Sequence, residues 1–326
     1  MLSIIIPIYN EEETLPLLFD RLISASPLWK EDFEVILVDD GSSDNSYEIM
    51  RAKASDDSRF VIVRFSRNFG HQAAVSAGMR YARGDAVIIM DGDLQDPPET
   101  LPQFLDKWRE GYDVVYAIRT KRKEGLIKRI AYASFYRILH SISDLNIPLD
   151  SGDFCVMDKK VVRALNEEMP EQIRFVRGLR AYVGFKQIGV TYERDKRAAG
   201  EVKYTFKKLM KLAVDGIFGF SLTPLRTAIF FGSFISLISF LVGIFFIVHR
   251  LFNFPIFGHY AEETPGLATL AVGIFFLGGL IMVMIGILGE YIGRIYIEVK
   301  KRPFFIVDTV FKKPETKTTA SPDKSV

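Results

Sequence analysis

The first half of the chain alternates short apolar runs with segments of helical spacing. The apolar runs, each of strand length, cover residues 3–8, 34–39, 60–66, 86–91 and 113–118. The segments between them have helical spacing or a helix-start signal and cover residues 12–24, 43–54, 71–82 and 98–110. Ser43 and Pro98 are expected to open their helices. Strand–helix alternation predicts an α/β domain with a mostly parallel, Rossmann-like sheet covered on both faces.

Two later segments, residues 127–142 and 206–217, combine helical spacing of apolar residues with basic neighbours. Two ordinary helices packed on the α/β domain would explain this pattern. The basic flanks favour a second interpretation, in which both are interfacial amphipathic helices that meet anionic lipid headgroups. The second segment leads directly into a long apolar stretch, which supports the interfacial interpretation.

Residues 227–248 and 266–289 contain no charged side chain, and each stretch exceeds the roughly 20 residues needed to cross a bilayer. They predict a hairpin of two transmembrane helices. Basic residues flank the two outer ends, so the positive-inside rule places both termini in the cytoplasm. Gly289 and Gly293 have the small-xxx-small spacing of packed membrane helices.

These patterns predict four parts along the chain. An α/β domain covers residues 1–200, an interfacial helix 201–225, the two transmembrane helices 226–292, and a tail 293–326. Within the tail, residues 303–310 are strand-like, and the polar residues from Lys312 onward predict disorder. The first residues enter a strand at once, which predicts that there is no signal peptide and that the first domain stays in the cytoplasm. Together with the two predicted spans, this indicates a multi-pass protein of the cytoplasmic membrane.

The amino-acid composition argues against several classes of function and site. Hydrophobic residues make up 48% of the chain and charged residues 25%, with a net charge of +2. The basic residues fall in short clusters beside apolar segments, which gives no sign of nucleic-acid binding. The single cysteine, Cys155, excludes an internal disulfide and a cysteine-based metal site, and we expect it to pack as a small hydrophobe.

Acidic residues follow three of the predicted strands. Asp91 and Asp93 come after the apolar run at 87–90, while Glu11 and Asp40 follow the first two strands. Ligands of parallel sheets bind beyond the carboxyl ends of the strands, where these acids meet. Mg²⁺ takes one or two carboxylates together with phosphate oxygens, so Asp91 and Asp93 suit an ion that bridges to a diphosphate. A solvated turn with two acids remains the alternative for this pair alone.

Four motifs resemble glycosyltransferase family 2, whose members have a GT-A fold. They are Pro7-Ile8-Tyr9-Asn10-Glu11, Val38-Asp39-Asp40-Gly41-Ser42, Asp91-Gly92-Asp93-Leu94-Gln95-Asp96-Pro97-Pro98-Glu99 and Gly152-Asp153-Phe154. The closer resemblance is to polyprenyl-phosphate glycosyltransferases of the bactoprenol glucosyltransferase type. It covers about residues 1–310 and includes Leu288-Gly289-Glu290-Tyr291-Ile292-Gly293-Arg294 after the second span.

The resemblance implies transfer of a sugar, with glucose as the first candidate, from a UDP-sugar to undecaprenyl or another polyprenyl phosphate. Mg²⁺ or Mn²⁺ would be the cofactor, and the reaction would invert the configuration at the anomeric carbon. It would take place at the cytoplasmic face of the membrane. A homo-oligomer is expected, with a tetramer as the hypothesis for its size. The implied site residues are Pro7, Tyr9, Glu11, Asp40, Arg67 and Asp91 for the nucleotide, Asp93 for the metal, Asp153 with Asp91 and Asp93 for catalysis, and Arg197 and Lys203 for phosphate. By their charge, basic residues such as Arg119, Arg122 and Arg129 are further candidates to neutralise the lipid phosphate.

Two points leave the assignment of roles open. Family members often carry a serine where this chain has Val202, which puts a hydroxyl contact to phosphate in doubt. Asp153 is the usual candidate base, yet a phosphate monoester already carries about −1.5 to −2 charges near neutral pH and needs little deprotonation. Asp153 could therefore hold the geometry of the acceptor side instead.

Several alternative functions fit parts of the sequence. UDP-N-acetylglucosamine is a close second donor, and a polyprenyl-phosphate mannose synthase that uses GDP-mannose shares most of the motifs. A processive polysaccharide synthase is disfavoured because neither tryptophan, Trp29 nor Trp108, follows an arginine as a Q-x-x-R-W motif requires. A catalytically silent membrane scaffold would not need the acids at 40, 91, 93 and 153 together.

Overall fold

The computed structural model describes residues 1–119, 151–172, 174–193, 221–252 and 266–313. Its contacts divide the chain into two compact units: the N-terminal α/β region together with Arg302–Val326, and a second unit that contains Leu212–Lys301. The predicted interfacial segments, and with them Arg122, Arg129, Arg197 and Lys203, lie outside the described residues.

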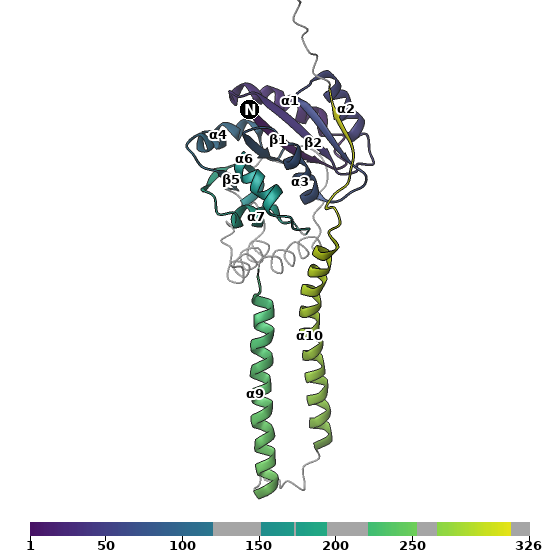
Figure 1. Ribbon diagram of the computed structural model, residues 1–326, viewed down its shortest axis with the longest axis vertical. Helices are drawn as coiled ribbons and strands as arrows, with labels where there is room; N and C mark the ends of the chain where they lie inside the picture. The colour runs from purple at the N-terminus through teal and green to yellow at the C-terminus, as the bar shows by residue number, and fades with distance from the viewer. Residues whose placement is uncertain (120–150, 173, 194–220, 253–265, 314–326) are drawn as a thin grey trace, which may run out of the picture. The chain divides into compact units, whose positions relative to one another are not determined.

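The first unit is built on an eight-stranded sheet in the order β7-β5-β6-β4-β1-β2-β3-β8 (Figure 1). The strands are β1 (Leu2–Ile8), β2 (Phe33–Asp39), β3 (Phe60–Phe65), β4 (Ala86–Ile89), β5 (Val114–Arg119), β6 (Ser151–Asp158), β7 (Gln187–Tyr192) and β8 (Val307–Lys312). The pairs β1–β2, β1–β4, β2–β3 and β5–β7 are parallel. Strand β6 runs antiparallel to β4 and β5, and β8 antiparallel to β3. The predicted mostly parallel sheet is confirmed.

Helices cover both faces of this sheet. They are α1 (Leu15–Ala25), α2 (Ser46–Asp56), α3 (His71–Tyr81), α4 (Leu101–Arg109), α6 (Lys159–Arg163) and α7 (Val176–Tyr182), with short turns η1 (Ser26–Leu28), η2 (Pro98–Thr100) and the π-helical η3 (Ala164–Glu168). Side chains alternate along β1, so that Ile4 and Ile6 join the core beneath α1 and α4. Ile5 points to the other face and packs on α3 at Gly78, where a Cβ would clash with the Ile5 side chain.

Three local predictions need correction. Ser43 does not open a helix: α2 begins at Ser46, because the amide of Ser43 donates to Asn10 and Asp44 accepts from the amide of Ser46 instead. The C-terminal strand begins at Val307 rather than 303, and Lys312, predicted to open a disordered tail, ends that strand. Strands β6 and β7 were not predicted, whereas Cys155 is buried in β6 as expected.

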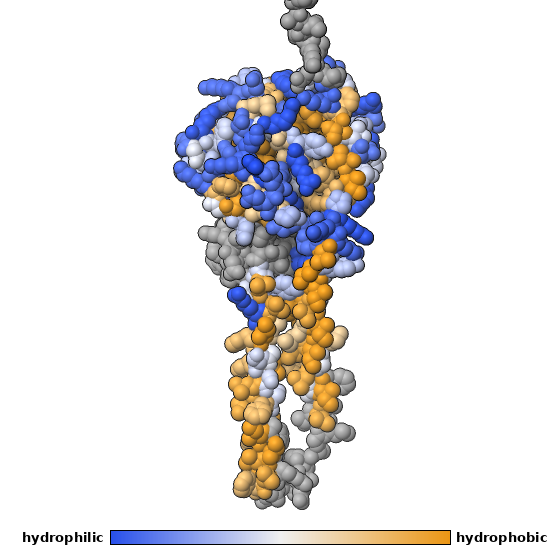
Figure 2. All heavy atoms as spheres, viewed as in Figure 1, coloured by the Kyte–Doolittle hydropathy of each residue, from blue (hydrophilic) through white to orange (hydrophobic). Residues whose placement is uncertain are grey.

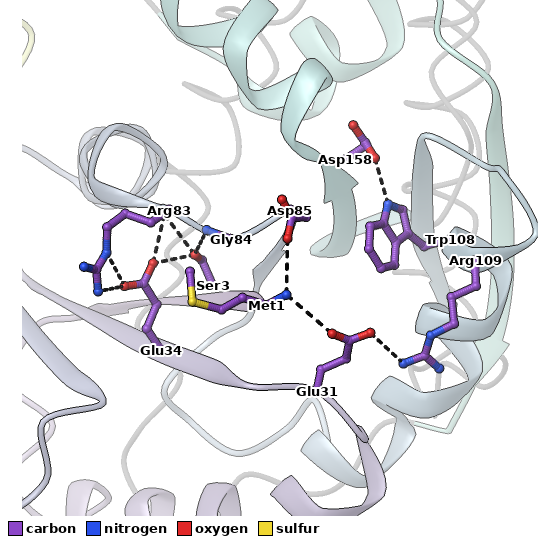
Figure 3. Close-up of polar contacts among 10 residues, drawn as sticks. All are labelled: Met1, Ser3, Glu31, Glu34, Arg83, Gly84, Asp85, Trp108, Arg109 and Asp158. Carbon is purple, nitrogen blue, oxygen red and sulfur yellow. Dashed lines mark hydrogen bonds and ion pairs between the residues drawn. The ribbon is translucent and has the colours of Figure 1, made fainter.

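A polar network lies where the parallel strands begin (Figure 3). Glu34 of β2, which is 3% exposed, accepts hydrogen bonds from the Ser3 hydroxyl at 2.6 Å and from the Arg83 guanidinium at 2.6 and 2.9 Å. The Ser3 hydroxyl oxygen in turn accepts from the amide of Gly84 at 2.7 Å. The network ties β1, β2 and the turn before β4 together at the sheet edge opposite the carboxyl ends of these strands.

The second unit contains helices α9 (Thr223–Phe252) and α10 (Gly266–Lys300). Each has a stretch long and apolar enough to cross a membrane, Thr223–His249 and Phe276–Lys300, and neither stretch is buried. Figure 2 shows hydrophobic residues along both helices on the face in view. The helices approach closely at Gly232, where a Cβ would lie 2.9 Å from Cε of Met284. Helix α10 continues past Gly289, where the predicted second span ends.

Candidate active site

The loops after β1, β2 and β3 meet at one edge of the sheet. Asn10 has a φ of 53° and Gly41 a φ of 69°, both in the left-handed region that asparagine and glycine tolerate. A Cβ at Gly41 would lie 2.5 Å from the carbonyl carbon of Arg67. The loop after β2 therefore packs directly on the loop after β3, and only glycine fits at this position.

Asp40 supports the loop that precedes α3. Its side chain is 4% exposed, and its carboxylate accepts hydrogen bonds from the amides of Phe69 at 2.7 Å and Gly70 at 3.0 Å. Burial raises the pKa of Asp40, and the two amide donors oppose that rise. These contacts hold the loop in place, while nucleoside binding by Asp40 stays a prediction.

The other residues predicted to hold the nucleotide lie on β1 and the neighbouring loops. Tyr9 follows β1 and is 41% exposed. The carboxylate of Glu11 accepts a hydrogen bond from the Thr14 hydroxyl at 3.0 Å. Pro7 is half-buried within β1, and Arg67 lies on the exposed loop after β3. The strand-end topology thus gathers these residues at one edge, and their roles stay predictions.

The structure brings Asp91 and Asp153 together. Strands β4 and β6 are antiparallel with Ile89 opposite Cys155, and continuing this register places Asp91 opposite Asp153. His71, the first residue of α3, lies beside both acids: its Nε2 is 3.3 Å from Oδ2 of Asp153 and 4.0 Å from Oδ1 of Asp91. Asp91 and Asp153, which are 62 positions apart in the sequence, therefore belong to one site.

Arg177 of α7 forms a bidentate ion pair with Asp153. Its Nε donates to Oδ1 at 2.6 Å and its Nη2 donates to Oδ2 at 2.8 Å. Burial by itself would raise the pKa of Asp153, but the charge and hydrogen bonds of Arg177, with the contact of His71, hold that pKa well below its usual range. Asp153 is therefore an ionised carboxylate at neutral pH.

The charges of His71 and Asp91 depend on this cluster. Burial would lower the pKa of His71, but the close contact with Asp153 and the charge of Asp91 outweigh it and raise the pKa to about 9. Burial raises the pKa of Asp91; the charge of His71 opposes the rise, and the carboxylates of Asp96, Asp153 and Asp93 add to it. The cluster thus combines crowded acids with an imidazolium.

Asp91 and Asp93 have the chemistry of a divalent-cation site. Asp93 is 6% exposed, and its Oδ1 accepts a hydrogen bond from the amide of Gln95 at 3.1 Å. Among the described residues no three His, Cys, Asp or Glu side chains gather as a complete metal cage. Mg²⁺ in nucleotide sites needs only one or two carboxylates, and a cation would offset the crowding of carboxylates around Asp91. The residues present fit such an ion.

Sequence reasoning missed His71 and Arg177. His71 carried a signal, because it follows the loop after β3 and so belongs to the strand-end edge. Arg177 carried none, since its place depends on how α7 packs against β6. Of the basic residues predicted for phosphate, four lie outside the described part of the chain: Arg122, Arg129, Arg197 and Lys203.

Residues 3–165 match the family described as Glycosyl transferase family 2. The chain belongs to this family. "Uncharacterized glycosyltransferase YkcC" of Bacillus subtilis is 45% identical over 94% of this chain and 92% of its own length. "Prophage bactoprenol glucosyl transferase homolog" of Escherichia coli is 39% identical over 95% of this chain and 99% of its own length. The solved structure of S. aureus TarS 1-349 covers 70% of this chain and 68% of its own, at 17% identity and a TM-score of 0.42.

The family membership confirms the resemblance that the motifs carried, including its bactoprenol glucosyltransferase type. The protein is a glycosyltransferase, and the α/β architecture of its first unit is the GT-A fold that the resemblance implied.

Proposed function

We propose that this glycosyltransferase moves a sugar, with glucose as the first candidate, from a UDP-sugar to undecaprenyl phosphate or another polyprenyl phosphate. Relatives named bactoprenol glucosyl transferase, 40% identical over 94% of this chain, support a polyprenyl acceptor. The observation that carries the proposal is the cluster in which Asp91 meets Asp153, His71 and Arg177 at the ligand-binding edge of the sheet. Acids for a metal-bound diphosphate and cations for a phosphate acceptor lie side by side there.

The proposed reaction is a single displacement with inversion. An oxygen of the acceptor phosphate forms a bond to the anomeric carbon, while the bond from that carbon to the β-phosphate oxygen breaks and its electron pair leaves with UDP. When the attacking phosphate monoester is fully ionised, its charge is redistributed between the phosphodiester product and UDP, and no proton needs to move. The main task of the site is then to orient two anions and offset their repulsion.

The proposed roles of the residues are those that the family resemblance implies. Tyr9 would flank the base, Glu11 would accept hydrogen bonds from the nucleoside, and Asp91 would lie near the ribose and donor. Asp93 would ligate the divalent cation, Mg²⁺ or Mn²⁺, which when bound supplies positive charge to the departing diphosphate. Further proposed contacts come from Pro7, Asp40 and Arg67 to the nucleotide and from Arg122, Arg129, Arg197 and Lys203 to phosphate.

We further propose that α9 and α10 anchor the enzyme as a transmembrane hairpin at the cytoplasmic face. The chain enters α9 from the first unit and returns to it after α10, because β8 pairs with β3 of the catalytic sheet. Both outer ends of the hairpin thus lead to one compact unit, which supports their location on one side of the bilayer. The basic residues Arg294, Lys300, Lys301 and Arg302 favour the cytoplasmic side.

The test is transfer of radiolabelled sugar into organic-extractable lipid. The purified full-length protein is mixed with undecaprenyl phosphate and Mg²⁺, with UDP-glucose, UDP-N-acetylglucosamine or GDP-mannose in separate reactions. We expect a labelled lipid from UDP-glucose that EDTA abolishes. Asp93→Ala should lower transfer by about 100-fold or more, as the loss of a group that stabilises transition-state charge does.

The matched control is Asp106→Ala, which removes an acid that is 68% exposed on α4 and should leave transfer unchanged. If only GDP-mannose yields a labelled lipid, the donor is GDP-mannose and not the proposed UDP-glucose. Absence of product from every donor, in a protein that still binds UDP, would contradict the proposed reaction.

A further inference from the structure

The ion pair between Asp153 and Arg177 occupies both carboxylate oxygens. Oδ1 accepts from Nε at 2.6 Å, and Oδ2 accepts from Nη2 at 2.8 Å with the imidazole of His71 3.3 Å away. Bidentate, charge-assisted hydrogen bonds of this kind are short, strong and directional. A general base must offer a lone pair to the proton it removes, and here one lone pair of each oxygen is already engaged by the guanidinium. The geometry is that of an anchor for Arg177 and the neighbouring imidazole.

The backbone around the pair is fixed on two sides. The amide of Val176, the first residue of α7, donates to Oε1 of Gln72 at 2.8 Å. Gln72 adjoins His71 at the start of α3, so the same turn of α3 holds the start of α7 and supplies the imidazole. Arg177 is the next residue of α7. Helices α3 and α7 and strand β6 therefore place the three side chains jointly.

These side chains are within reach of a ligand. Arg177 is 22% exposed, Asp153 12% and His71 33%, whereas the Nε2 atom of His71 is itself buried beside Asp153. A planar guanidinium matches the oxygens of a phosphate better than an ammonium does, and the adjacent imidazole of His71 can offer an N–H donor beside it. Asp91 contacts His71 and belongs to the acids that suit a metal-bound donor.

The chemistry of the acceptor requires such cations. A phosphate monoester carries about −1.5 to −2 charges near neutral pH, and it must approach an anionic diphosphate. Cations placed beforehand at the attack site lower this repulsion in the transition state. Because transfer from the fully ionised monoester moves no proton, a carboxylate on the acceptor side is not needed as a base. It can instead position the side chains that bind the phosphate.

We propose that Arg177 and His71 bind the phosphate of the acceptor, and that Asp153 is a positioning residue that holds both side chains instead of a base that deprotonates the acceptor. This inference rests on the proposed function, because it requires a phosphate monoester acceptor. The attacking phosphate oxygen forms the bond to the anomeric carbon, UDP leaves with the electrons of the broken bond, and Asp153 stays ionised throughout.

The test separates acceptor KM from kcat in the full-length enzyme with undecaprenyl phosphate as the varied substrate. Arg177→Gln should raise acceptor KM by about 10- to 100-fold, as expected for loss of hydrogen bonds to a charged group, and leave donor KM unchanged. Arg177→Lys keeps the charge but not the planar fork and should raise acceptor KM less. Arg163→Gln removes an arginine that is 73% exposed and paired with Glu167, and should change neither constant.

Asp153→Asn distinguishes the two roles of Asp153. An anchor predicts a higher acceptor KM. It also predicts that the double variant, Asp153→Asn with Arg177→Gln, loses less than the product of the two single effects, because both substitutions break the same assembly. A base predicts a lower kcat at unchanged acceptor KM, with the effects of the two substitutions multiplying. The second pattern would overturn the proposal.

Two further readouts keep the result interpretable. Slow hydrolysis of the UDP-sugar by water does not use the acceptor phosphate and should survive in Arg177→Gln, which shows that the variant is folded and binds donor. If that variant does not fold, Arg177→Lys decides: an unchanged acceptor KM in the lysine variant would overturn the proposal. Failure of the proposed function is a different outcome, in which the unsubstituted enzyme labels no lipid.

Discussion

His71 is the residue whose charge depends most on the fold. It lies between Asp91 and Asp153, and these neighbours raise its pKa to about 9 against the opposing effect of burial. In the unfolded chain an imidazole titrates near about 6.5. The folded protein therefore binds the proton of His71 more tightly than the unfolded chain does, which links stability to pH.

The sign of this linkage gives a prediction. The stabilisation from His71 is fully present below about pH 6.5 and is lost as pH rises through about 9, because the imidazolium is then deprotonated in both states. We expect His71→Gln to lower the Tm of metal-free protein clearly near about pH 6 and little near about pH 10. The check is thermal unfolding of both proteins across this range. A difference in Tm that does not change with pH would contradict the assigned charge of His71.

Sequence reasoning could reach some residues of the site and not others. Asp91, Asp93 and Asp153 belong to motifs of the family, so the resemblance supplied them, and the antiparallel register of β4 and β6 explains why Asp91 and Asp153 meet. Arg177 has no such motif in the sequence reading. Its contact with Asp153 spans 24 positions and depends on packing of α7 that no local pattern encodes.

At the scale of elements, burial decided which strands could be predicted. Strands β1 to β4 are apolar runs buried on both faces, so their sequences stand out against the polar loops. Strand β6 opens with Ser151, Gly152 and Asp153, which look like a loop, and β7 is only partly buried. Both are placed by the sheet they join, because neighbouring strands satisfy their backbone groups.

The network at the strand starts gives an element-scale prediction. The Glu34 side chain is 4% exposed and joins β2 to the turn before β4 through Arg83, which is 52% exposed. Glu34→Gln removes the charge from these hydrogen bonds and should lower the free energy of unfolding by about 1–3 kcal/mol. Donor KM should not change, because the network lies at the edge opposite the site. Chemical denaturation and donor titration measure the two effects.

Glu48→Gln is the control for this substitution. Glu48 is 67% exposed and its partner Arg51 is 3.9 Å away, so its loss should change the free energy of unfolding by less than about 0.5 kcal/mol. Equal effects of the two substitutions would contradict a stabilising role for the buried network.

At the scale of the whole molecule, the glycines of α10 favour self-association. A Cβ added at Gly278, Gly279, Gly286, Gly289 or Gly293 would meet no atom of the described residues within 4 Å. By the 3.6-residue period these positions share one side of α10, and Gly273 lies on the opposite side. Small residues on one side of a membrane helix let another helix approach closely. Within one chain, larger side chains would clash with nothing that the structure describes.

Because five glycines lie on one side of α10 and Gly273 lies on the other, oligomerisation can be tested without disturbing the fold of the protomer. The purified protein in mild detergent should have the mass of a homo-oligomer, with a tetramer as the hypothesis, when measured by light scattering. Gly289→Leu combined with Gly293→Leu should lower that mass, because the leucines block close approach of a second copy. Gly273→Leu adds the same bulk on the opposite side and should leave the mass unchanged. A single-protomer mass for the unsubstituted protein, or an unchanged mass for the double variant, would remove these glycines from any interface between copies.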